Sequence, residues 1–275
     1  MADFSLEDIK TLRERLGTGM VDTKNALVEA GGDLEKATEL LRLKGAKGNA
    51  KRADRSTSEG VVVAKAVDGR ATVIELACET DFVAKGEKFG ALSERVLDAI
   101  VAAGANTVEE ALAADLDGKT VAAAIDEEAA VIGEKFELRR VAVVEADKFE
   151  IYLHKTSKDL PPQIAVVVGY TGDDADAARG IAQHISFANP SVLSREDVSE
   201  ADIENERRIV EEISRGEGKP EAALPKIIEG RLGAYFKQVA LLEQDYARDN
   251  KVTIAKVAQD AGITVTGFVR IKVGA

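Results

Sequence analysis

Hydrophobic residues near the start of the chain recur at intervals of three and four positions, a spacing typical of amphipathic helices. The first apolar stripe comprises Leu6, Ile9, Leu12 and Leu16. Ser5 and Asp8 form a capping-box pattern at its beginning, and Gly17 is expected to end the helix. The stripe must be buried against another element, because a single helix cannot cover its own apolar face.

Two further helices are predicted in the same region. One covers residues 21–30, and the other starts at the N-cap Asp33 and stops at Gly45. Three short helices bury only a modest core. A module of this size usually presents a face to a partner, so residues 1–53 are predicted to form a three-helix binding module.

Farther along, the pattern changes to alternation with period two and to runs of β-branched residues. Residues 61–67 and 71–78 are predicted to pair as a β-hairpin around an Asp-Gly turn. Apolar residues at helical spacing then predict a helix over residues 87–103. This helix can cover one face of the hairpin, so the first core unit is a sheet with a helix packed on it.

A similar order of elements returns later in the chain. Strands are predicted over residues 141–146, 150–154 and 163–170, and a helix over residues 174–186. Alternation at residues 264–273 predicts a last strand that returns to this second sheet. The middle of the chain is therefore expected to hold two related sheet-and-helix units.

Residues 196–239 are strongly charged and carry two apolar stripes at helical spacing, separated by a Gly-Glu-Gly-Lys-Pro break at residues 216–220. Two antiparallel helices that project from the core account for this pattern. Their apolar seams pack against each other or against a second chain, and the residues alone leave both alternatives open.

Together these elements predict an α+β fold. Residues 1–53 form the three-helix module, residues 54–140 core subdomain N, residues 141–190 and 229–275 core subdomain C, and residues 191–228 an inserted helical hairpin. Each core subdomain is expected to be an antiparallel sheet with helices on it.

Cysteine content and hydropathy indicate a cytoplasmic protein. The single cysteine, Cys78, excludes an intramolecular disulfide framework and fits a reducing compartment. No basic region followed by an apolar core starts the sequence, and apolar runs such as residues 164–168 are far shorter than the roughly 18 residues that span a bilayer. We expect a protein that is neither secreted nor bound to a membrane.

The charge balance argues against nucleic acid as a direct partner. The chain has 37 basic and 49 acidic residues and a formal net charge of −12, which repels phosphate backbones. The basic stretch at residues 44–55 has no aromatic side chain for base stacking. Its ordinary interpretation is a solvated helix end and linker.

No catalytic or metal-binding constellation assembles from the sequence. Cys78 could pair with His154 or His184, but it lies in a strand pattern without a nucleophile motif, which favours a buried structural thiol. The Gly-Lys-Thr triplet at residues 118–120 lacks the earlier glycine of a phosphate-binding loop and is expected to be a turn. The aspartates within residues 173–176 lack calcium-loop spacing and are expected to begin a helix. We predict no catalytic residue, metal or cofactor.

The segment Thr80-Asp81-Phe82-Val83 permits two interpretations of its phenylalanine. Phe82 follows a strand end on a turn, where a large side chain can point into solvent. Phe82 and Phe89 also lie about two helical turns apart, so both could share one core face, and periodicity alone favours this second interpretation.

Extended by two residues, Thr80-Asp81-Phe82-Val83-Ala84-Lys85 resembles the signature of the bacterial translation elongation factor Ts family. The resemblance covers nearly the whole chain and follows the family's order. The further matching segments are Leu12-Arg13-Glu14-Arg15, Gly19-Met20, Asp22, Lys24-Asn25-Ala26-Leu27, Lys219-Pro220, Glu229-Gly230-Arg231 and Thr266-Gly267-Phe268.

This resemblance implies a guanine-nucleotide exchange factor for the translational GTPase elongation factor Tu. It implies an N-terminal module similar to ubiquitin-associated domains that contacts the GTPase domain, and a core that contacts this domain and a distal β-barrel. Asp81 and Phe82 would approach the magnesium and phosphate-binding elements of the GTPase and dislodge the ion, so that GDP leaves. The partner-contacting residues carried over by position are Thr80, Asp81, Phe82, Val83, Met20, Lys24, Ile132 and His154.

The chain departs from the family pattern in two places. Residues 16–19 read Leu-Gly-Thr-Gly where the family usually has Thr-Gly-Ala-Gly, which weakens the transfer of contacts there. The sequence runs to Ala275, almost immediately after the last predicted strand, which weakens the transfer of the contact that some family members make with the GTPase through a terminal helix.

Three further expectations stay open at this stage. An adaptor or scaffold that binds a ubiquitin-like or nascent-chain partner is the alternative function. A hydrolase or redox enzyme built around Cys78 is the rival from another class. Homodimerisation through the helical hairpin, known in part of the family, is a third open point.

Overall fold

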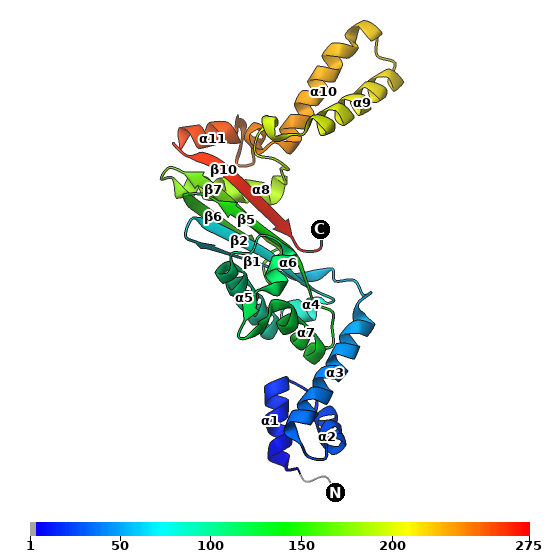
Figure 1. The fold of residues 1–275 in the computed structure, drawn as a ribbon. Coiled ribbons are helices and arrows are strands. Elements are labelled where there is room, and N and C mark those ends of the chain that lie inside the picture. The colour runs from blue at the N-terminus through cyan, green and yellow to red at the C-terminus, as the bar shows by residue number, and fades with distance from the viewer. Residues whose placement is uncertain (1–3) are drawn as a thin grey trace.

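The core of the molecule consists of two three-stranded antiparallel sheets stacked face to face. The computed structural model describes residues 4–275, and Figure 1 shows the two sheets between layers of helices. The first sheet has the order β1-β2-β5, formed by β1 (Glu59–Val67), β2 (Arg70–Cys78) and β5 (Glu137–Glu145). The second has the order β10-β7-β6, formed by β6 (Lys148–His154), β7 (Ile164–Thr171) and β10 (Thr264–Lys272).

The alternation of side chains along each strand explains this stacking. Val61 and Val63 of β1 join the apolar layer under the helices, while Val62 joins the layer between the sheets. In β7, Val166 likewise faces the helices and Val167 faces the other sheet. These strands form nearly continuous apolar runs because neither of their faces meets water.

Helices cover the outer face of each sheet. The first sheet is covered by α4 (Asp81–Ala84), α5 (Glu87–Ala103), α6 (Val108–Ala113) and α7 (Val121–Ile132). The second sheet is covered by α8 (Ala175–Ala188) and α11 (Ile254–Asp260). The bounds of α5 agree with the sequence prediction.

Short ribbons and 3-10 turns complete the core. The ribbons pair β3 (Asp115–Leu116) with β4 (Lys119–Thr120) and β8 (Asp245–Tyr246) with β9 (Asp249–Thr253). The 3-10 turns are η1 (Arg195–Asp197), η2 (Glu221–Ala223) and η3 (Leu241–Glu243). The Gly-Lys-Thr triplet at residues 118–120 lies in the β3–β4 ribbon, which confirms the prediction of a turn.

The N-terminal module contains α1 (Leu6–Leu16), α2 (Met20–Glu29) and α3 (Leu34–Arg52) around its own apolar core. The predicted capping box and the left-handed Gly17 at the end of α1 are confirmed. The predicted stop at Gly45 is wrong, because α3 continues through this glycine. A Cβ atom at Gly45 would come within 2.8 Å of Ala130 in α7, so the glycine allows close helix packing here.

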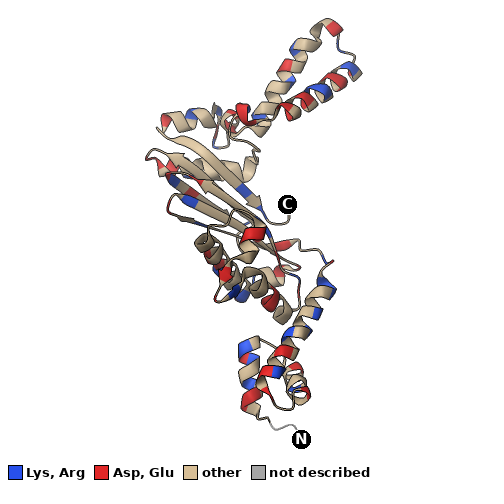
Figure 2. Cartoon of the chain, viewed as in Figure 1, with Lys and Arg blue, Asp and Glu red and all other residues tan. Residues whose placement is uncertain are grey.

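The basic stretch at residues 44–55 includes the last turns of α3 and the three residues after it. Figure 2 shows Lys and Arg along this part of the helix. Lys44 pairs with Asp22 at 2.6 Å, and Arg55 pairs with Glu79 at 3.2 Å. Part of the positive charge is therefore compensated within the chain, in keeping with a solvated helix end.

The helical hairpin consists of α9 (Glu200–Gly216) and α10 (Leu224–Val239), and it projects from the core at the end remote from the N-terminal module (Figure 1). The two helices bury a shared apolar seam formed by Val198, Val210, Leu224, Ile228, Leu232 and Phe236. Self-packing thus accounts for most of the apolar stripes, while Ile213 stays 47% exposed.

Two of the predicted domain boundaries fall inside secondary-structure elements. The boundary after residue 140 cuts β5, which pairs with β2 in the first sheet, Val141 lying opposite Ile74. The boundary after residue 228 cuts α10. The strand predicted at residues 141–146 overlaps β5, but its assignment to the second sheet is wrong, because alternation alone does not reveal the sheet partner.

A buried carboxylate connects the two sheets. Glu75 of β2 is fully buried and accepts hydrogen bonds from Arg139 at 3.3 Å, from Arg140 at 2.6 Å and from the backbone N–H of Gly274 at 3.0 Å. Gly274 follows β10, so one side chain joins three segments. These partners offset the large cost of removing the charge from water.

We expect Glu75→Ala to lower the free energy of unfolding by about 3 kcal/mol, because it removes one acceptor from each of two guanidinium groups and the acceptor of one backbone N–H. Urea unfolding measures the change. As a matched control, Glu145→Ala removes an exposed ion pair with Arg70 at 4.0 Å and should cost less than about 0.5 kcal/mol. Equal losses in the two variants would contradict this role of Glu75.

Candidate functional site

The segment Thr80-Asp81-Phe82-Val83 supplies the N-cap and the first three residues of α4, a single helical turn shortly after the end of β2. Thr80 is its N-cap, and the side-chain oxygen accepts the backbone N–H of Val83 at 3.4 Å. The short element is terminated at once by Lys85 and Gly86, so it presents its side chains on a tight bend rather than along a helix.

Phe82 points into solvent. Its side chain is 84% exposed, whereas Phe89 is 1% exposed and stacks edge-to-face on Phe136. The interpretation that Phe82 and Phe89 share a core face is therefore wrong. The break between α4 and α5 interrupts the helical phase, so a seven-residue spacing does not place the two rings on one side.

Val83 and Ala84 hold the turn to the core. Ala84 is buried in the apolar layer under the helices, and Val83 packs against the same layer. The apolar residues of the turn thus divide into two that anchor it and one, Phe82, that is left outside. An apolar side chain so placed is a candidate for contact with a partner.

Asp81 lies beside Phe82 and pairs with Lys85 at 2.7 Å. This hydrogen bond lowers the pKa of Asp81 and raises the pKa of Lys85. The charge of Asp159, in the segment between β6 and β7, also raises the pKa of Lys85. At neutral pH the turn therefore carries an ionised carboxylate next to an exposed aromatic ring.

The remaining predicted contact residues lie on separate elements. Met20 begins α2 and is 52% exposed, and Lys24 lies one turn later on the same exposed face. Ile132 ends α7 and packs partly against the first core layer. His154 ends β6 and shares a 3.0 Å hydrogen bond with the hydroxyl of Tyr152.

The structure does not bring these residues together into a pocket. The N-terminal module that carries Met20 and Lys24 lies beyond α7 in Figure 1, while His154 belongs to the second sheet. A single small ligand cannot touch all of them. An extended partner surface can.

Cys78 is a structural thiol. It is fully buried and donates to the carbonyl of Thr80 at 3.3 Å. Burial, and then the charges of Glu134 and Glu59, raise its pKa to about 12, so the thiolate nucleophile is scarce at neutral pH. His184 bonds instead to Gln244 at 2.8 Å, and burial lowers its pKa.

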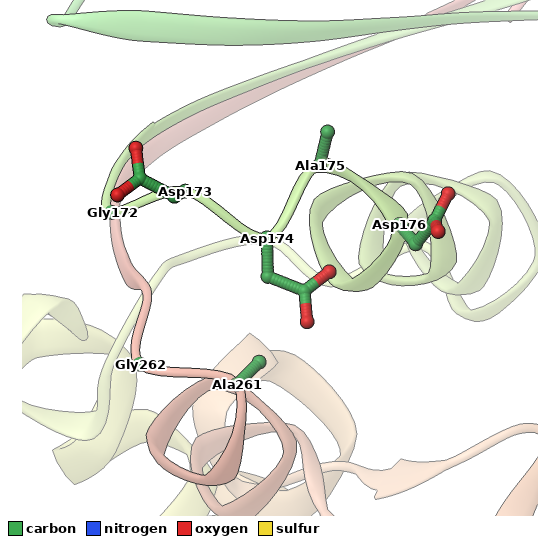
Figure 3. Close-up of a pocket in the computed structure, with 7 residues that line it drawn as sticks. All are labelled: Gly172, Asp173, Asp174, Ala175, Asp176, Ala261 and Gly262. Carbon is green, nitrogen blue, oxygen red and sulfur yellow. The ribbon is translucent and has the colours of Figure 1, made fainter.

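The aspartates at the start of α8 line a shallow pocket shown in Figure 3. Asp174 caps α8 by accepting the N–H of Ala177 at 2.8 Å, and Asp173 pairs with Lys148 at 2.6 Å. Figure 3 shows their carboxylates, and that of Asp176, pointing in different directions. They begin a helix, as the sequence predicted.

Within residues 4–275, no group of three or more acidic, histidine or cysteine side chains is arranged to hold a metal ion. No helix in the same part of the chain combines the length and apolar character needed to cross a bilayer. The turn at Asp81 and Phe82 is one of the places where a large apolar side chain is exposed, together with Leu6 and Phe187.

These observations describe an α+β protein with an exposed turn that is a candidate partner-binding surface. A family model described as "Elongation factor TS" matches residues 79–275. Proteins named Elongation factor Ts align over the full length of both chains, with 74% identity in Leifsonia xyli subsp. xyli, 67% in Clavibacter michiganensis subsp. michiganensis and 53% in Tropheryma whipplei. The chain belongs to the elongation factor Ts family.

We expect Phe82→Ala to leave the free energy of unfolding within about 0.5 kcal/mol of the wild type, because the ring makes little contact with the core. Phe89→Ala should cost about 3–5 kcal/mol, since it empties a buried aromatic site. Chemical denaturation of the two variants makes the comparison. A large loss of stability in Phe82→Ala would show instead that this ring is part of the core.

Proposed function

We propose that the chain catalyses GDP release from elongation factor Tu by placing Asp81 and Phe82 against the GTPase domain, where they dislodge the magnesium ion. The observation that carries the proposal is the outward position of Phe82, 84% exposed, on a turn whose sequence is the family signature. Family membership supports nucleotide exchange as the activity and elongation factor Tu as the partner.

Linkage limits what the turn can do alone. If the factor weakens nucleotide binding, the nucleotide weakens binding of the factor by the same ratio. Burial of one phenylalanine is worth roughly 1.5–3 kcal/mol, which is about one to two decades in an equilibrium constant. Burial of Phe82 alone is therefore too small a contribution to displace a tightly bound nucleotide.

Loss of the magnesium ion supplies the additional effect. A divalent ion is usually the largest local charge in a phosphate-binding site, so its removal weakens the hold on GDP far more than one apolar contact. In the proposal, Phe82 and the ionised Asp81 displace the elements that hold the ion, and Thr80 and Val83 keep the turn in shape.

Other surfaces anchor the turn. We assign to Met20 and Lys24 the contact of the N-terminal module with the GTPase domain, to Ile132 a contact of the core with this domain, and to His154 a contact with the distal β-barrel. The separation of the N-terminal module, α7 and β6 along the molecule suits a large partner bound at several points (Figure 1). Binding and action are thus divided between different parts of the chain.

The proposal places this activity in the cytoplasm and gives the chain no catalytic residue, cofactor or direct contact with nucleic acid. The net charge of −12 and the partial pairing of the basic stretch on α3 support the last point. Homodimerisation through the hairpin of α9 and α10 stays a prediction. An adaptor for a ubiquitin-like or nascent-chain partner is the alternative that the N-terminal module alone would suit.

The wild-type chain should accelerate the release of fluorescent GDP from elongation factor Tu, and Phe82→Ala should reduce this acceleration by about one to two decades. Stopped-flow fluorescence measures both rates. Binding of the variant to nucleotide-free elongation factor Tu checks that the anchoring contacts persist. No acceleration by the wild type would refute the proposed function.

Cys78→Ala separates exchange from thiol chemistry. Because the thiol is buried and protonated, we expect the variant to keep the wild-type maximal exchange rate at a temperature where it is folded. Loss of exchange in a folded Cys78→Ala protein would favour the rival class of enzyme built on this cysteine.

A further inference from the structure

The turn that carries Asp81 and Phe82 is held by the carboxylate of Glu134, which follows the C-terminal end of α7. The Oε2 atom of Glu134 accepts the backbone N–H groups of Glu79 at 3.2 Å and Thr80 at 3.1 Å. Its Oε1 atom accepts the hydroxyl of Thr80 at 2.6 Å. One side chain thus receives three hydrogen bonds from the two residues that precede α4.

A second carboxylate acts in the opposite direction. The Oε1 atom of Glu79 accepts the backbone N–H of Lys135 at 2.6 Å, and Glu79 also pairs with Arg55 at 3.2 Å. The carboxylate of Glu134 therefore binds the backbone at Glu79 and Thr80, and the carboxylate of Glu79 binds the backbone at Lys135. We call this pair of glutamates the carboxylate clamp. Charge-assisted bonds of this kind are about twice as strong as neutral ones.

The clamp acts on the turn through its N-cap. Thr80 donates its hydroxyl hydrogen to Glu134 and accepts the N–H of Val83 with the same oxygen. A helical turn of four residues has no stability of its own, because nucleation fixes several dihedral angles for a single backbone hydrogen bond. The direction of the exposed Phe82 side chain thus depends on contacts from outside the turn.

We infer that Glu134 is the positioning residue of the exchange site, which fixes the Asp81-Phe82 turn in the orientation that acts on the GTPase. Glu134 lies two residues after Ile132, so the clamp also ties the turn to the proposed core contact at the end of α7. The inference rests on the proposed function. It concerns a residue that acts through Thr80 and needs no contact with the partner.

Glu134→Gln tests the inference at nearly constant side-chain size. The amide offers one acceptor oxygen in place of two, so it cannot receive all three hydrogen bonds. We expect the maximal rate of GDP release to fall by about tenfold, while the concentration of factor at half-maximal rate changes less than about twofold. A merely structural residue would move neither quantity in the folded protein.

Glu128→Gln is the matched control. Glu128 lies on α7, six positions before Glu134, and its side chain forms no hydrogen bond or ion pair with any residue in the described range 4–275. It should keep the wild-type rate. An unchanged maximal rate in Glu134→Gln, or a change confined to the half-maximal concentration, would overturn the positioning role.

A double-mutant cycle tests whether Glu134 affects the exchange rate through its hydrogen bond to Thr80. Thr80→Val removes the hydroxyl that joins Glu134 to the turn, so Thr80→Val combined with Glu134→Gln should lower the rate little more than the stronger single change. Fully multiplicative effects would show that Glu134 acts independently of Thr80 and would overturn the inference.

Hydrogen exchange of the chain alone provides a readout that needs no partner. In Glu134→Gln, the amide hydrogens of Glu79 and Thr80 should exchange faster, while those of β7 keep their protection if the fold is intact. Unchanged exchange at these two amides would overturn the clamp. If the wild-type chain does not accelerate GDP release from elongation factor Tu but Glu134→Gln speeds exchange at the Glu79 and Thr80 amides, the proposed function is refuted and the clamp is supported.

Discussion

The layer of apolar side chains between the two sheets is the constraint on which the rest of the structure depends. Val62 and Val73 of the first sheet meet Val167 and Ile271 of the second in this layer. Pro162 accepts the N–H of Val62 at 3.2 Å across the same boundary. The stacking therefore brings the end of β2, where the exposed turn begins, to the same end of the core as the segment that follows β6.

The exposed turn is consequently positioned by the elements packed around its base and not by a cleft. β2, α7 and the layer beneath α5 fix the base of the turn, and only Phe82 and the charged groups beside it reach solvent. The N-terminal module and the hairpin extend from opposite ends of this core (Figure 1). A protein built in this way presents separated contacts along its length, which suits a partner of comparable size better than a small ligand.

Local patterns in the sequence predicted most helices and strands, because caps and periodicity are local. The Ser5 capping box, the end of α1 at Gly17 and both bounds of α5 follow from neighbouring residues alone. The extension of α3 beyond Gly45, the pairing of β5 and the clamp at Glu134 depend on residues far away in the chain. The family resemblance drew attention to Ile132, but no spacing rule linked the nearby Glu134 to Thr80.

The pairing of β7 with β10 has a consequence for folding during synthesis. These strands are joined only after residues 172–263 have been made, and the intervening chain includes the whole hairpin. The first sheet and its helices can close earlier, since their strands all precede residue 146. Until β10 emerges from the ribosome, the apolar inner face of the first sheet lacks part of its cover, so the nascent chain passes through a stage in which that face is prone to aggregation.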